Sequence, residues 1–541
     1  MSKEQKKDEK VKKNEEVTRK IKLFLSRTKK EKWATDVWNE LKKWNQKQKS
    51  LMEEQELQKI FEDVSSLESQ SRNEKKDEEL SVLEDIIFSD DVEYFVDQIK
   101  EVYVRVKTDK CYETLRADSG RFESWIIKKY NVLTGGIPSV GKIGKVLSLL
   151  KARAGYGDKK YELSIRCGYS SGCLWYDLAN EKWNAVRIDK NGWDIVDVPP
   201  IIFKRNTQNE QVIPALGGNA KDLLRFVNIK GKKQQLLFLV STIFEFVPHV
   251  PRPIQVYFGS QGSAKTTVGR IVKSTVDPSS VELLTMLNST RELTQQLDQN
   301  YLLPFDNLTA LSIKTSDTLC RAVTGGGLSK RKLYTDSDNI IFNYKRAIII
   351  NGVNLVANKP DLLDRSLLFE LERIDEKNRK SEEDFWQEFN SDKPKIIGAI
   401  FGVLSNALSI LPSVKLSKTP RMADFAKWGC AIAESLGYTQ EEFIDAYEEN
   451  CGLQNRRAIE ENPVASAILI FAENCKHWNG TSQELLKELI TVADKEELDV
   501  KLFSKSPSSL SRQINEIKSN LLTEDVKIEK ISQRIWRIEK L

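Results

Sequence analysis

The chain has 541 residues, too many for one hydrophobic core, so several domains are expected. Its 84 Lys+Arg and 79 Asp+Glu nearly cancel, and residues 1–50 hold 17 of the former against 8 of the latter, so the positive excess belongs to an N-terminal arm. Seven scattered cysteines without a CxxC pair, and only two histidines, argue against a disulfide framework, a zinc ribbon and imidazole-based catalysis. The N-terminus lacks an apolar secretory region, and the apolar stretch 396–414 is interrupted by Ser and Asn. The sequence therefore predicts a cytoplasmic protein with no membrane span.

Residues 1–81 predict a charged helical arm. Trp33, Val37, Leu41 and Trp44 are spaced by 4, 4 and 3 positions, which places them on one face of a helix. The stripe favours docking on the arm's own body or on a neighbour. A basic, tryptophan-bearing arm that contacts nucleic acid is the alternative.

Residues 82–205 alternate short apolar segments with Gly and Asn, after a helical piece at 141–154. This pattern is typical of short strands and turns and predicts a small α/β accessory domain. Its aromatic residues are expected in a core rather than as platforms for bases.

A phosphate-binding loop follows the apolar strand Ile254–Phe258. The segment GSQGSAKTT fits GxxxxGK[ST], except that Ala264 replaces the last glycine, and we expect Ala264 to keep the loop's shape with a negative φ. Backbone N–H groups of such a loop surround phosphates, Lys265 neutralises their charge, and the Thr266 hydroxyl binds Mg²⁺. ATP with Mg²⁺ is the expected ligand. The predicted ATP-binding residues of this loop are Gly259, Ser260, Gln261, Gly262, Ser263, Ala264, Lys265, Thr266 and Thr267.

A second apolar strand, 301–305, ends in Asp306 and Asn307. A carboxylate there can hold Mg²⁺ together with Thr266. Asn307 stands where many ATPases have a glutamate base; it can position water but cannot accept a proton. This favours nucleotide binding more than fast hydrolysis.

Three further polar residues are predicted at the nucleotide. Asn351 follows the apolar strand 346–350, where a γ-phosphate sensor belongs. Arg365 precedes a last strand and can act as an arginine finger on a neighbouring subunit; a surface pair with Asp361 or Asp364 is the alternative. Arg421 is expected to be a second sensor from a helical lid, or a helix-start residue that packs on Asp424.

This ordered set of motifs resembles the superfamily 3 helicases of the AAA+ class, in particular the ATPase modules of plasmid, viral and prophage primase-helicases. The matching segments are GSQGSAKTT, LLPFDNLTAL, SDTLCRAVTGGGLSKRKLYTD, RAIIINGV, PDLLDRSLLFEL and RMADFAKWG. The resemblance implies an α/β fold with a P-loop AAA+ core at 206–375 and a helical lid at 376–455. It also implies a ring hexamer that binds ATP between subunits and moves on DNA. Residues 1–250 carry no acidic pair of a primase, so a separate primase is the expected partner.

The resemblance places a pore-facing β-hairpin between the second strand and the sensor strand. Lys330, Arg331 and Lys332, followed by LYTDSDNIIFNYK, fit two short strands around a turn. Three adjacent cations would contact single-stranded DNA through its phosphates, without reading sequence. An exposed basic turn is the alternative.

Residues 456–541 resemble a winged helix–turn–helix. Helices are expected at 463–472, 482–492 and 506–522, with a wing in KIEKISQRIWRIE. The third helix would present Arg512, Gln513 and Lys518 to a DNA groove. Residues 455–541 hold 14 basic and 14 acidic residues, so a protein-contact role stays equally open.

These observations predict an ATP-dependent DNA helicase or translocase of a mobile element's replication system, acting as a ring oligomer. The first alternative is an AAA+ switch that assembles or loads a DNA-bound partner and hydrolyses ATP slowly. The second is a DNA-binding initiator whose P-loop only stabilises oligomers. Asn307 favours the first alternative, and the cationic hairpin favours the helicase.

Overall fold

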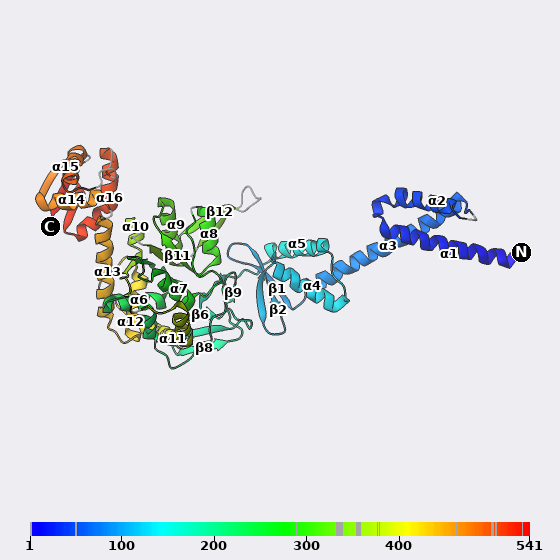
Figure 1. Ribbon diagram of the computed structural model, residues 1–541, viewed down its shortest axis with the longest axis horizontal. Coiled ribbons are helices and arrows are strands. Elements are labelled where there is room, and N and C mark those ends of the chain that lie inside the picture. Colours follow the sequence, from blue (N-terminus) through cyan, green and yellow to red (C-terminus); the bar gives the residue numbers. More distant parts are fainter. Residues whose placement is uncertain are drawn as a thin grey trace. The chain divides into compact units, whose positions relative to one another are not determined.

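The computed structural model describes residues 3–48, 51–287, 289–331, 339–343, 345–352, 359–375, 377, 379–460, 462–498, 503, 506–532 and 534–541. The chain forms two compact units. The N-terminal unit comprises Met1–Phe95, Val102–Val106 and Leu115–Lys159, and the C-terminal unit comprises Val96–Glu101, Lys107–Thr114 and Lys160–Leu541. Figure 1 shows the elements of both along the chain.

The arm of the N-terminal unit is a small helical bundle. Its helices are α1 (Lys3–Arg27), α2 (Trp38–Gln46) and α3 (Glu54–Ile87), with irregular helical turns at Lys30–Lys32 and Trp33–Val37. Trp33 is 5% exposed in the core of this bundle, and its indole N–H donates to Thr28 O at 3.0 Å. Val37 and Leu41 are fully buried in the same core. The predicted stripe therefore docks on its own arm, and Trp33 presents no face for base stacking.

The N-terminal unit has a second hydrophobic core, formed by a small sheet and two helices. The elements are β1 (Val92–Val96), β2 (Val102–Lys107), β3 (Tyr112–Arg116), α4 (Gly120–Thr134) and α5 (Val140–Tyr156), with strand order β1-β2-β3. Ser119 caps α4 by accepting the Phe122 N–H, and Gly135 ends it in the left-handed conformation. The helix predicted at 141–154 is confirmed as α5.

The C-terminal unit begins with an antiparallel meander of four strands. These are β5 (Cys167–Ser170), β6 (Cys173–Asp177), β7 (Ala185–Asp189) and β8 (Gly192–Val196); β4 (Leu163–Ser164) pairs separately with β9 (Ile202–Phe203). Tyr176 of the meander packs against the rings of Phe246 and Phe401, at centroid distances of 5.4 and 5.3 Å. The predicted accessory domain 82–205 is thus divided, because the meander shares a continuous core with the segments that follow it.

A four-stranded parallel sheet forms the centre of this unit, in the order β11-β14-β10-β15. Its strands are β10 (Ile254–Phe258), β11 (Leu302–Leu308), β14 (Ala347–Gly352) and β15 (Ser366–Glu370). The helices among them are α6 (Lys232–Phe244), α7 (Lys265–Val276), α8 (Thr290–Gln299), α9 (Ile313–Thr324) and α10 (Pro360–Leu363). All five residues of β10 are buried, as expected for a central parallel strand covered on both faces. The strands predicted from the sequence are confirmed.

Three helices follow the sheet: α11 (Glu382–Ile410), α12 (Ala423–Ser435) and α13 (Gln440–Glu460). Among the described residues, α11 with its extension to Ser413 is the one helix long and apolar enough to cross a membrane. Half of its apolar window is buried, and Phe401 and Leu404 lie in the core of the unit. Core helices of soluble proteins pass the same length and composition test, and the sequence predicts a buried helix at this place.

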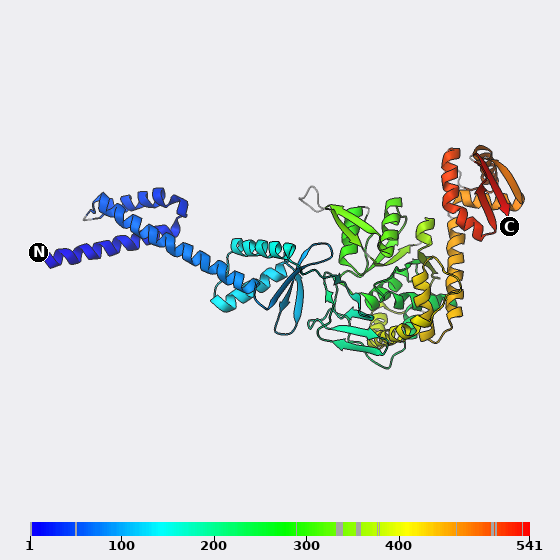
Figure 2. The same ribbon diagram turned by 180° about the vertical axis from the view of Figure 1, so that it is seen from behind.

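The described residues from Pro463 to Leu541 form a compact α/β module (orange to red in Figures 1 and 2). Its elements are α14 (Pro463–Asn474), β16 (His477–Thr481), α15 (Ser482–Lys495), α16 (Pro507–Thr523), β17 (Val526–Lys530) and β18 (Ile535–Lys540), with strand order β16-β18-β17. Helices and hairpin match the predicted winged-helix order, and β16 is an additional strand. Thr481 and Glu484 form a capping box at the start of α15.

Candidate nucleotide site

The loop between β10 and α7 contains three residues with positive φ. Gly259 has φ 138° and Gly262 has φ 77°. A Cβ on Gly259 would lie 2.1 Å from Leu371 O, so only glycine fits there. Of the other predicted loop residues, Ser260 and Gln261 are exposed, Ser263 is buried, and Thr267 lies in the first turn of α7. The glycines therefore shape the loop as the sequence predicts.

Ala264 departs from the expectation of a negative φ. It has φ 65° and ψ 28°, in the left-handed region, and immediately precedes α7. A left-handed alanine costs about 1–2 kcal/mol because its Cβ approaches the carbonyl oxygen. The position thus requires the glycine-like conformation even though it carries a methyl group.

Lys265 spans the mouth of the loop. Its Nζ donates to Gly259 O and Ser260 O, both at 2.8 Å, and to Ser263 Oγ at 3.2 Å. Burial lowers the pKa of Lys265, and the negative charge of Asp306 opposes this. An ammonium held on neutral carbonyls is placed to accept an anion in the loop.

Thr266 and Asp306 meet as predicted. The Thr266 hydroxyl donates to Asp306 Oδ1 at 3.1 Å, joining the start of α7 to β11. Among the described residues, no group of three or more His, Cys, Asp or Glu side chains could hold a metal ion. Any Mg²⁺ at this place would be held by Thr266, Asp306 and oxygens of a bound phosphate.

Asn351 joins the strands beside this pair. It is buried at the end of β14, in register with Tyr257 of β10, and its Oδ1 accepts the Asn307 N–H at 2.7 Å. Asn307 has φ 55° at a bulge of β11 and is exposed. Asn351 therefore fixes the backbone on which Asp306 and Asn307 are mounted.

Arg365 and Arg421 lie together near the amino end of β15, whereas the loop follows the carboxyl end of β10. The Ile254 N–H donates to Arg365 O at 2.7 Å, so Arg365 lies at the start of β15, about 16 Å along the strand from the loop. Arg365 Nη1 donates to Asp361 O at 2.7 Å and pairs with the carboxylate of Asp361. Arg421 Nη2 donates to Asp361 Oδ1 at 2.6 Å and its Nη1 pairs with Asp364. Of the two pairs predicted for Arg365, the one with Asp361 is present. The pairs of Arg421 with Asp361 and Asp364 were not predicted. Neither guanidinium lies at the loop of its own chain.

The predicted hairpin is present in the backbone. β12 (Gly327–Arg331) pairs antiparallel with β13 (Asn339–Asn343), and Lys330 and Arg331 occupy the last two paired positions before the turn. Lys332 lies outside the described residues.

The cations predicted on the third helix of the C-terminal module lie on α16. Arg512 and Lys518 are exposed, whereas Gln513 is half-buried between them. Glu516 is exposed in the same stretch, so the surface of α16 is of mixed charge. This agrees with the balanced composition of the module and favours neither DNA nor protein.

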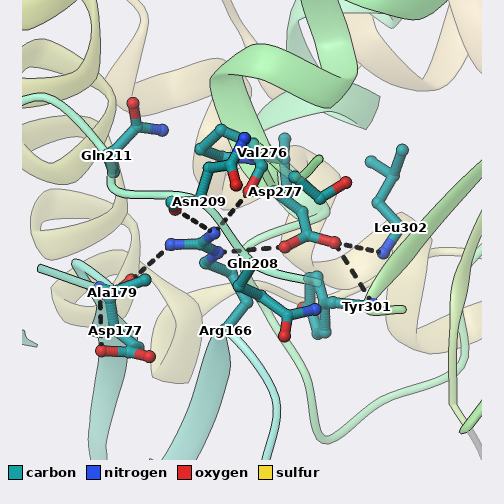
Figure 3. A network of polar contacts seen from close by, with 12 residues as sticks. Arg166, Asp177, Ala179, Gln208, Asn209, Gln211, Val276, Asp277, Tyr301 and Leu302 are labelled. Atoms are coloured by element: carbon teal, nitrogen blue, oxygen red, sulfur yellow. Dashed lines mark hydrogen bonds and ion pairs between the residues drawn. The ribbon is translucent and has the colours of Figure 1, made fainter. Parts of the chain in front are cut away.

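A buried polar network holds the far end of α7 (Figure 3). Arg166 is 0% exposed; its Nε donates to Asp277 Oδ1 at 3.0 Å, and its Nη groups donate to the carbonyls of Asp177, Asn209 and Pro278 at 2.7–2.8 Å. Lys273 Nζ donates to Asp277 Oδ2 at 2.8 Å. Burial alone would raise the pKa of Asp277, but the charges of Lys273 and Arg166 hold it below its ordinary value. The network ties the meander to the helix that carries the loop.

A cavity of about 660 Å³ lies at the amino ends of the parallel strands. His249 lines it, stacked on Tyr169 with ring centroids 3.8 Å apart. Burial, with the charges of Lys345 and Arg252, lowers the pKa of His249 to about 4, against a weaker opposing effect of Asp424.

This histidine predicts a loss of stability in acid. Between pH 6.5 and about 4 the unfolded chain binds a proton at His249 and the folded chain does not, so the free energy of unfolding falls as the pH falls. We expect His249→Phe, which keeps an aromatic ring on Tyr169, to remove up to about 2 kcal/mol of the loss between pH 7 and 4.5. Urea unfolding at both pH values measures it, and equal losses in both proteins would contradict the assignment.

Three residues that sequence reasoning missed also lie at the loop. Asn228 Nδ2 donates to Glu372 O at 2.6 Å and to Ser263 O at 3.4 Å. A Cβ on Gly262 would lie 3.6 Å from Arg379 Nη2 and 3.9 Å from Arg373 Cγ. No sequence motif marks these positions. The one feature of the sequence that points to them is that Arg373 and Arg379 follow closely after the last strand of the sheet.

Comparison with known proteins gives two family matches. Residues 220–450 match the model of the actinomycete integrative conjugative element replication protein, and residues 464–541 match the model of the RepA C-terminal domain of these elements. No curated protein matches the chain. Together the two matches support a replication protein of a mobile element.

Solved structures give a weaker likeness. The apo structure of the NrS-1 C-terminal region has 14% identity and a TM-score of 0.39, covering 85% of this chain and 98% of that one. An A form apo structure of the same region has 13% identity and a TM-score of 0.38, with coverages of 85% and 99%.

Proposed function

We propose that this replication protein is an ATP-driven DNA helicase or translocase of the superfamily 3 type, acting as a ring oligomer. The observation that carries the proposal is the contact of Thr266 with Asp306 at 3.1 Å, beside a lysine held over a glycine loop. Hydroxyl, carboxylate and ammonium are the groups needed to hold a Mg²⁺–triphosphate. The proposed cofactors are accordingly ATP and Mg²⁺.

The position of Arg365 supports a ring. Arg365 lies at the amino end of β15 and the loop lies at the carboxyl end of β10, so this guanidinium cannot reach its own nucleotide. In a head-to-tail ring, one edge of each subunit faces the opposite edge of the next. Arg365, with Arg421 beside it, would then complete the site of a neighbour, in the manner of an arginine finger.

The hairpin supports DNA as the partner. Lys330 and Arg331 adjoin its turn, and a ring would gather copies of these cations around one pore. Such a contact would be made to phosphates and would be independent of sequence. A separate primase would supply primers, as the sequence suggests.

Stimulation of hydrolysis by DNA tests the proposal. We expect single-stranded DNA to raise the ATPase rate of the natural protein at least about tenfold, and replacement of Lys330, Arg331 and Lys332 by Ala to remove this stimulation, because the phosphate contacts are lost. ATP binding should be unchanged in that variant.

The control is a variant of equal charge loss away from the hairpin. Lys182, Arg187 and Lys190 are exposed in the meander, and their replacement by Ala should leave the stimulation intact. A natural protein that binds ATP but is never stimulated by DNA would contradict the helicase.

A second candidate function is a slow AAA+ switch that assembles or loads a DNA-bound partner. Asn307 favours it, because it has no carboxylate that could accept a proton from water. Its backbone N–H already donates to Asn351 Oδ1. Under this alternative, ATP binding changes the oligomeric state while DNA leaves the hydrolysis rate unchanged.

A further inference from the structure

The segment that follows β15 passes directly along the loop. The Leu371 N–H donates to Phe258 O at 2.8 Å, which continues β15 beside the end of β10. The Ile374 N–H donates to Gly262 O at 3.2 Å, and Asn228 ties Glu372 to Ser263. The path of this segment over the loop is thus set by hydrogen bonds from both sides.

Two guanidinium-bearing side chains are delivered by this path. Arg379 Nη2 lies 3.6 Å from the position of a Cβ on Gly262, and Arg373 Cγ lies 3.9 Å from it. Both side chains are exposed, and within the described part of the chain no carboxylate forms an ion pair with either. An exposed guanidinium beside such a loop, with no carboxylate paired to it, can form charge-assisted hydrogen bonds with a bound phosphate.

The loop itself carries one positive side chain, so a further cation beside it would strengthen the binding of a Mg²⁺–triphosphate. Lys265 is its single cation, and Arg421, expected to contribute from the helical region, is held by Asp361 and Asp364 near the amino end of β15. Gly262 lies within the stretch whose N–H groups surround a phosphate, so a guanidinium at 3.6 Å from its Cβ position is within reach of phosphate oxygens.

We propose that Arg379 is a phosphate-binding residue that contacts the nucleotide of its own subunit. This inference rests on the nucleotide site of the proposed function and names a residue for it. Arg379 would thus make the contact to the nucleotide of its own chain that was expected from Arg421. Ligands with a diphosphate or triphosphate are recognised by this contact, and the base is not.

Nucleotide binding by Arg379→Ala tests the inference. Using ATP and ADP in titration calorimetry with Mg²⁺, we expect Kd to rise about tenfold for both, the usual loss for a hydrogen bond to a charged group. Arg379→Lys should recover part of the affinity, because it keeps the charge without the fork of donors. The preference for ATP over GTP should be unchanged.

Lys377→Ala is the matched control, since Lys377 is exposed on the same segment two positions away. It should bind ATP as the natural protein does. Unchanged ATP affinity in Arg379→Ala, or a lost preference between ATP and GTP without weaker binding, would overturn the inference. If the natural protein and Lys265→Ala bind ATP equally, the nucleotide site itself is wrong; if only Lys265→Ala loses binding, the failure belongs to Arg379 alone.

Discussion

Replacement of Lys265 by Ala is expected to weaken ATP binding about 100-fold or more, because one ammonium makes several charge-assisted contacts to phosphates. In the structure, Lys265 Nζ is held by Gly259 O, Ser260 O and Ser263 Oγ. A bound phosphate would exchange these neutral acceptors for charged ones. It would also raise the pKa of the ammonium, which burial lowers in the free protein.

The measurement is ATP affinity by calorimetry, with thermal unfolding to show that the variant is folded. Lys233→Ala is the control, since Lys233 pairs with Glu449 on an exposed surface and its loss should leave binding unchanged. Retained ATP affinity in Lys265→Ala would exclude the loop as the nucleotide site. It would then also remove the basis for the proposed function and for the role of Arg379.

Replacement of Arg166 by Met is expected to lower the free energy of unfolding of the C-terminal unit by about 3–5 kcal/mol. The change removes the guanidinium donor from the carbonyls of Asp177, Asn209 and Pro278. The bond to Asp177 O is buried, whereas Pro278 O keeps the Asn209 N–H as a second donor. It also leaves Asp277 with Lys273 as its one charged partner in the network. Each unsatisfied buried group costs about 1–3 kcal/mol, which accounts for the size of the effect.

Urea unfolding followed by circular dichroism measures this loss. Arg187→Met is the matched control, because Arg187 pairs with Asp194 at 2.8 Å on the surface of the meander and its loss should cost below about 1 kcal/mol. The double variant Arg166→Met with Asp277→Asn should lose less than the sum of the single variants, since both remove one interaction. Equal losses for Arg166→Met and Arg187→Met would show that the buried network does not stabilise the unit.

Much of the site was predictable because its chemistry is local. An apolar strand, a run of glycines and a lysine at the start of a helix follow one another within a few residues, and backbone preferences set their shape. The pairing of Thr266 with Asp306 was also predictable, because parallel strands end at the same edge of a sheet. The hairpin β12–β13 and the order of elements in the C-terminal module follow from alternation and turn residues in the same way.

Other features could not be read from the chain. The sequence separates Arg166 from Asp277 by 111 positions, and nothing in either neighbourhood marks them as partners. Domain 82–205 was predicted from a uniform texture of short strands, yet burial of Tyr176 against Phe401 assigns its second half to the core of the C-terminal unit. Ala264 was expected at negative φ, and closure of the loop at the helix start imposes 65°.

By itself, the sequence determined which short segments form the strand, the glycine loop and the helix start of the candidate nucleotide site, since strand periodicity, glycine geometry and the lysine all act over neighbouring residues. The tertiary structure decided which cations accompany that loop. Arg421 turns to Asp361 near the amino end of β15, and Arg379 arrives beside Gly262 because the chain after β15 is hydrogen-bonded along the loop. Charge interactions depend on distance in space, which the order of residues does not specify.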